Sequence, residues 1–117
     1  MKTHTIFVDK IKSSVTFLVG TCAEENGDLI DLVNPYDLWF HVEGRPSCHV
    51  VTQLQEEPTW TRKERGYVVR QGALLCKQMS KYKAEKNVAI VFTTIENVEK
   101  TEVVGSVMTK NCGHITV

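Results

Sequence analysis

Residues 35–50 read PYDLWFHVEGRPSCHV, and this stretch decides how the chain is expected to fold. From Asp37 to Glu43 polar and apolar side chains alternate, which is the period-two pattern of a half-buried β-strand. The apolar face of this strand consists of Leu38, Phe40 and Val42. Residues 44–47 have turn chemistry, so Cys48–Leu54 is expected to return as a second, antiparallel strand.

Further segments on both sides of this hairpin have the patterns of strands and helices. Residues 22–33 favour a turn or short helix, and a long helix is predicted over residues 60–83, where apolar residues recur at three-four spacing. The other predicted strands are His4–Val8, Val15–Val19, Val88–Ile95 and His114–Val117. The sequence therefore predicts an α+β fold, with a mostly antiparallel sheet of about five strands packed against one long helix and a short helix.

The composition is that of one globular domain spanning residues 1–117. The apolar fraction is 42% and the charged fraction is 24%, and no apolar run is long enough to cross a membrane. The N-terminus lacks the apolar region of a secretion signal, and the four cysteines are widely and irregularly spaced. These features predict a soluble cytoplasmic protein with reduced thiols and no membrane partner.

Charge is strongly segregated along a chain whose net charge is zero. Residues 20–43 contain six carboxylates and no lysine or arginine, whereas residues 62–86 contain eight bases and two acids. Such a distribution can present one positive face to a polyanion while the molecule stays neutral overall. Arg62, Lys63, Arg65 and Arg70 cluster in the first half of the long helix and are the predicted phosphate contacts.

Trp39 and His41 are expected on one face of their strand, with Arg45 and His49 at or just beyond the turn. An exposed indole beside histidines and an arginine would form a surface on which nucleic-acid bases stack. In the alternative interpretation, Trp39 is buried under the long helix or against residues 22–33.

The same residues include a cysteine and two histidines, which are side chains that can serve in catalysis or metal binding. Cys48 and His49 are adjacent and so point to opposite faces of a strand, which argues against a nucleophile and base pair completed by His41. The chain has no CxxC or HExxH motif and no glycine-rich phosphate loop. We therefore expect no enzyme activity, no bound metal and no cofactor.

In order and spacing, several motifs resemble the NFACT-R family, the C-terminal domain of ribosome quality-control factors related to NEMF and RqcH. The similarity runs from residue 20 to the end of the chain, and its most specific part is DLWFH at 37–41 followed by Ser47 and His49. The segment SKYK at 80–83 also matches. The resemblance supports Asp37, Trp39, His41 and His49 as the signature residues of a nucleic-acid-binding site. Arg45 and the helix bases are expected to flank them, and the predicted flanking residues are Arg45, Arg62, Lys63, Arg65, Arg70 and Lys81.

The resemblance also implies a stand-alone, non-catalytic RNA-binding module that acts in translation or ribosome quality control. Its expected partners are tRNA or rRNA, with ribosomal proteins as further partners and DNA as an alternative ligand. A second alternative is a protein-interaction module that docks on a ribosome-associated complex through the DLWFH surface.

Overall fold

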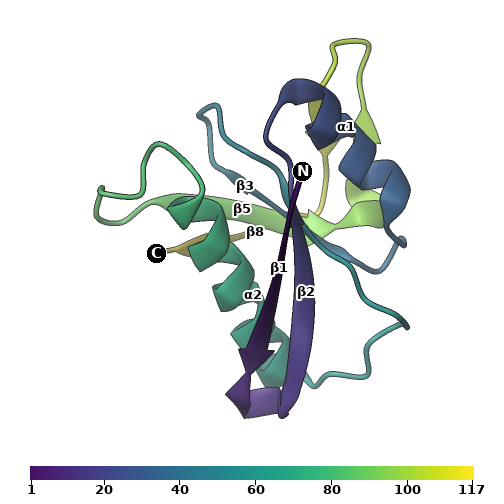
Figure 1. The fold of residues 1–117 in the computed structure, drawn as a ribbon, viewed down its shortest axis with the longest axis vertical. Helices are drawn as coiled ribbons and strands as arrows, with labels where there is room; N and C mark the ends of the chain where they lie inside the picture. Colours follow the sequence, from purple (N-terminus) through teal and green to yellow (C-terminus); the bar gives the residue numbers. More distant parts are fainter.

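The computed structural model describes residues 1–117 and contains one six-stranded antiparallel sheet with a helix against each face (Figure 1). The strand order is β1-β2-β4-β3-β5-β8, and β6 and β7 form a separate two-stranded ribbon. The predicted α+β class is confirmed, and the sheet has six strands where about five were expected. The sheet strands are β1 (Lys2–Val8), β2 (Ser13–Val19), β3 (Leu38–Val42), β4 (Val50–Thr52), β5 (Ala89–Thr94) and β8 (Gly113–Thr116). The remaining elements are η1 (Asp9–Ile11), α1 (Ala23–Leu32), α2 (Arg62–Gln78), η2 (Ile95–Asn97), β6 (Val98–Lys100) and β7 (Val107–Thr109).

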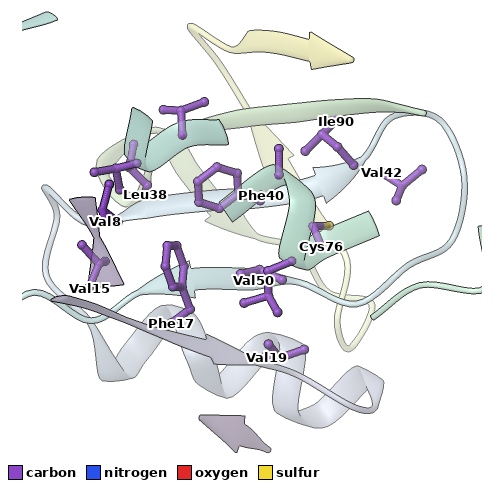
Figure 2. Packing of buried hydrophobic residues seen from close by; sticks show 14 of the residues in the cluster. Val8, Val15, Phe17, Val19, Leu38, Phe40, Val42, Val50, Cys76 and Ile90 are labelled. Atoms are coloured by element: carbon purple, nitrogen blue, oxygen red, sulfur yellow. The ribbon is translucent and has the colours of Figure 1, made fainter. Parts of the chain in front are cut away.

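The main core lies between α2 and one face of the sheet. Phe17 of β2 and Phe40 of β3 are fully buried at its centre, with their rings 6.4 Å apart (Figure 2). Gly72 of α2 packs directly on Phe40, because a Cβ at this position would come within 2.3 Å of the ring. The helix can therefore approach the sheet closely only at a residue that has no side chain.

A second, smaller core lies on the opposite face of the sheet. Leu18, Trp39 and Val51 project from the strands to this face, where Leu29 of α1 and Val98 of β6 cover them. Because adjacent residues of a strand point to opposite faces, β3 contributes Phe40 to one core and Trp39 to the other. The sheet is thus a central layer with α2 on one side and α1 with the β6–β7 ribbon on the other.

Helix α2 begins with a capping box, in which Thr61 Oγ1 accepts from the Glu64 amide and Glu64 Oε1 accepts from the Thr61 amide. It ends at Gln78, five residues before the predicted end at Lys83. The side chain of Ser80 accounts for the difference: its hydroxyl donates to the Lys77 carbonyl at 2.7 Å and accepts from the Tyr82 amide at 3.1 Å. A serine that bonds the backbone in this way competes with continued helix.

Other boundaries also differ from those predicted, and β1 and β2 each begin two residues earlier than expected. β4 covers only Val50–Thr52 of the expected Cys48–Leu54, because the Leu54 amide donates to the Asp37 carboxylate instead of joining the ladder. The mixed segment after β5 forms the β6–β7 ribbon. Neither helix has the length and apolar composition needed to cross a membrane.

Candidate nucleic-acid interface

The outward face of α2 has a row of basic side chains. Lys63, Arg70 and Lys77 are spaced seven residues apart, which is close to two full turns, so they lie along one line on the helix surface. Together they span about 21 Å of the helix axis at about 1.5 Å per residue. Arg62, at the first position of the helix, is also exposed, but as the sequence neighbour of Lys63 it projects to one side of this line. We call these four residues the basic stripe.

The basic stripe is free of acidic partners. Glu64 is the one carboxylate within α2, and the capping box uses it at the N-terminus of the helix. None of the four stripe residues takes part in an ion pair; Lys77 donates to a backbone carbonyl, that of Val117, at 3.1 Å. Arg62, Lys63 and Arg70 are therefore available to an external anion, whereas the half-buried Lys77 already has a hydrogen-bond partner in Val117.

Arg65 was predicted to join this cluster, but the structure places it on the flank of α2. It is half-buried, and its guanidinium lies 5.8 Å from the Phe92 ring of β5. Two residues of a helix that are two positions apart do not share a face, so Lys63 and Arg65 point in different directions.

Arg45, in the loop between β3 and β4, contacts the turn that follows α2. Its guanidinium stacks 3.8 Å above the Tyr82 ring, and its Nη1 donates to both carboxylate oxygens of Glu85 at 3.0 Å. Arg45 therefore already has an intramolecular anion partner, and the sequence did not indicate its contact with Tyr82. Lys81 of the same turn is exposed and adds positive charge beside the C-terminal end of the stripe.

Asp37 is fully buried and organises the chain around β3. One of its carboxylate oxygens accepts from the Asn34 amide, and the other accepts from the Leu54 amide and the Thr52 hydroxyl, each at 2.8 Å. The Thr52 hydroxyl also accepts from the Leu38 amide. A buried carboxylate with this many donors links three chain segments, and no part of it faces solvent.

Trp39 is 3% exposed, so the expectation that its indole lies on the surface is wrong, and the alternative of burial against residues 22–33 is the one observed. Its Nε1 donates to Nδ1 of His49, which is itself 4% exposed. The His49 amide donates to the side-chain oxygen of Asn26 in α1. The sequence did not single out Asn26, because nothing local to it marks a partner 23 residues away.

Three aromatic rings meet where β3 lies beside the start of β4. His41 is stacked parallel to Trp39, with ring centroids 5.8 Å apart, and is perpendicular to His49 at 5.1 Å. Burial lowers the pKa of His41, and burial together with the charge of His41 lowers the pKa of His49 to about 4. His49 is therefore neutral at physiological pH, and its Nδ1 is free to accept the indole hydrogen.

The basic stripe and these imidazoles lie on opposite sides of the sheet. Phe40 and Val42 point toward α2, so His41, which lies between them, points away from it. The expectation of one surface that combines stacking groups and phosphate contacts is therefore wrong. The acidic helix α1 also lies on the imidazole side, so its carboxylates do not cover the basic stripe.

Cys48 and Cys76 contact each other where the loop before β4 meets α2. Each sulfur lies 3.9 Å from the backbone carbonyl of the other cysteine. A hydrogen bond between the two thiols lowers the pKa of Cys48 and raises that of Cys76. The Cys48 sulfur thus points toward α2, whereas the His49 ring lies on the other face of the sheet, where it accepts from Trp39. No cluster of three or more potential metal ligands is present.

A row of basic side chains along one helix is a feature of nucleic-acid-binding domains. Residues 4–116 match the family model described as NFACT protein RNA binding domain, and the chain therefore belongs to the family of NFACT RNA-binding domains. The chain is 37% identical over 84 residues to the coiled-coil domain-containing protein 25 homolog of Dictyostelium discoideum, covering 66% of this chain and 37% of that protein. It is 30% identical over 95 residues to mouse coiled-coil domain-containing protein 25, covering 76% of this chain and 43% of that protein.

A solved structure has the same fold. The C-terminal part of the fibronectin/fibrinogen-binding protein from Streptococcus suis superposes with a TM-score of 0.79 at 22% identity, covering all of this chain and 46% of that one. The chain thus spans less than half the length of the two curated relatives and of the solved chain.

Proposed function

We propose that this RNA-binding domain engages tRNA or rRNA in cytoplasmic translation or ribosome-associated quality control, and that the basic stripe of α2 is its phosphate-binding surface. The observation that supports the proposal is the row formed by Lys63, Arg70 and Lys77, free of ion pairs and separated by the sheet from the acidic helix α1. Arg62 and Lys81 extend the row at its two ends.

A surface of this kind binds chiefly through the phosphate backbone. Between three and five phosphate contacts would give a slope of about −2 to −4 when the logarithm of the binding constant is plotted against that of the salt concentration. Phosphate contacts fix position and carry little sequence information, so we expect weak discrimination among RNA sequences. The alternative of protein docking through DLWFH loses its basis, because Leu38, Trp39 and Phe40 are all buried.

The test is charge reversal along the stripe, with Lys63, Arg70 and Lys77 changed to Glu together. Binding to a tRNA probe should weaken by at least two orders of magnitude, and the salt slope should become shallower by about 2 to 3, because about 0.7 to 0.9 is lost per contact. The charge control reverses Lys12, Lys100 and Lys110, which lie outside α2 and change the net charge equally. Because Lys12 and Lys100 pair with Asp9 and Asp31, the stability of this variant is measured before its affinity is compared.

A single-residue comparison refines the test. Arg70→Glu should weaken binding more than Arg65→Glu, because Arg65 lies off the stripe against Phe92. Equal loss in the stripe variant and its control would mean that net charge alone governs binding. Retained affinity and an unchanged salt slope in the stripe variant would exclude α2 as the interface.

A further inference from the structure

Strand β1 forms one edge of the sheet and leaves a row of backbone groups without partners. It pairs with β2 over its whole length, from Lys2 opposite Val19 to Val8 opposite Ser13. The Thr16 carbonyl of β2 accepts from Gln53, on the side of β4, so Thr16 does not bond to β1. Its neighbour across the ladder, Thr5, must therefore direct its own N–H and C=O outward.

The same alternation assigns the other outward-facing residues of β1. Thr3 and Phe7 are two positions from Thr5 on either side, so their backbone groups also point to the free edge. His4 and Ile6 face β2 instead. The open edge of β1 thus consists of the donors and acceptors of Thr3, Thr5 and Phe7.

This edge lacks the features that normally protect exposed strands. Residues 3–8 include no proline and no lysine, arginine or carboxylate, and the register with β2 has no bulge. Phe7 is 60% exposed on the same strand. The opposite edge of the sheet is β8, which has only four residues. His114 of β8 contacts Glu43, the residue that follows β3. A long, regular edge whose one lysine stands at its first position, and which exposes an aromatic ring, is suited to pairing with another strand.

We propose that two copies of this chain associate by antiparallel pairing of their β1 strands about a two-fold axis at Thr5. In this register Thr5 faces Thr5 of the second copy, and Thr3 of each copy faces Phe7 of the other, so every outward backbone group of these residues has a partner. The Phe7 ring then packs on a β-branched residue across the strands.

Charge also favours a second copy as the occupant of this edge. In the same register Lys2 lies opposite Val8 and His4 lies opposite Ile6, so no two charged residues of the paired β1 strands face each other. Asp9 of the other copy, which pairs with Lys12, follows Val8. An axis perpendicular to the sheet keeps both α2 helices on the same side. The dimer therefore presents two basic stripes on one face of a continuous sheet and both acidic α1 helices on the other.

The first experiment is sedimentation velocity of the wild-type chain from about 1 to about 300 µM, a range suited to a small interface. A concentration-dependent shift from monomer to dimer is expected. In Thr5→Pro the ring removes an N–H that points outward, so the β1–β2 ladder is kept and the dimer is lost. Phe7→Lys, which changes an exposed side chain, should also be monomeric.

Leu32→Lys is the matched control for Phe7→Lys, because Leu32 is 56% exposed on α1, away from the edge, and its variant should still dimerise. Amide exchange provides a second readout: protection of Thr5 and Phe7 should increase with protein concentration, whereas His4 and Ile6 should be protected throughout. A wild-type chain that stays monomeric over this concentration range overturns the proposal. The β1 edge would then be available for pairing with a strand of another protein. Dimers that persist in both edge variants overturn the proposal as well.

Discussion

His49 makes the stability of this domain depend on pH in a defined direction. Its pKa is lowered from 6.5 to about 4, first by burial and then by the neighbouring His41. Between these two values the unfolded chain binds a proton at this site and the folded chain does not. The contribution of the neutral ring is therefore complete above about pH 6.5 and is lost as the pH falls toward about 4.

The size of the effect follows from the shift. A pKa shift of this extent corresponds to about 3 kcal/mol in the free energy of unfolding. About 2 kcal/mol of this is lost when the pH is lowered from about 7.5 to about 5. Such a loss should lower the midpoint of urea unfolding by about 1 M for a domain of this size. The burial of His41 lowers its pKa too and adds to the change in the same direction.

The measurement is urea unfolding of the wild-type chain and of His49→Gln at about pH 7.5 and about pH 5. The glutamine oxygen can accept the Trp39 indole hydrogen, but the side chain does not titrate, and all other titratable groups are common to both proteins. The variant should lose about 2 kcal/mol less than the wild type on acidification. If both proteins lose the same amount, the buried neutral imidazole is not the source of the dependence.

Two substitutions test the packing on either side of the sheet. Trp39→Phe removes the donor to His49 and should cost about 1–3 kcal/mol in the free energy of unfolding, while the RNA affinity of the folded protein stays the same; reduced affinity at unchanged stability would instead make the indole a ligand contact. Gly72→Ala places a Cβ about 2.3 Å from the Phe40 ring and should lower stability by about 1–3 kcal/mol, as measured by chemical unfolding, with partial recovery when Phe40 is also changed to Leu. A fully stable Gly72→Ala protein would contradict the close contact between α2 and β3.

The sequence pattern was sufficient to predict an element when its apolar residues recurred with a single period and formed one buried face. The alternation in residues 37–43 predicted β3 and its inward face, and Leu38, Phe40 and Val42 are indeed buried against α2. The end of α2 was missed because helical periodicity continues past residue 78 while the Ser80 hydroxyl bonds the backbone there. Lys77 was left out of the predicted site, although its spacing from Lys63 and Arg70 was visible in the sequence.

The role of the signature residues required long-range contacts. Asp37 is satisfied by groups as far as 17 residues along the chain, and His49 by Asn26, 23 residues before it. Sequence alone could place Trp39 on the face opposite Phe40, but it left open whether solvent or α1 lay there. The structure shows that Asp37, Trp39 and His49, which were expected on a contact surface, are buried and hydrogen-bonded inside the domain.

The order of residues along the chain was enough to establish the α+β class, the inward face of β3, and the separation of acidic from basic segments, because each depends on the local periodicity or composition of one segment. Folding alone decided that α1 and α2 lie on opposite faces of the sheet, that the indole is enclosed, and that the imidazoles face away from the cations. These outcomes depend on which strands become neighbours and which helix covers each face, and pairings between distant segments leave no mark in any single stretch of sequence.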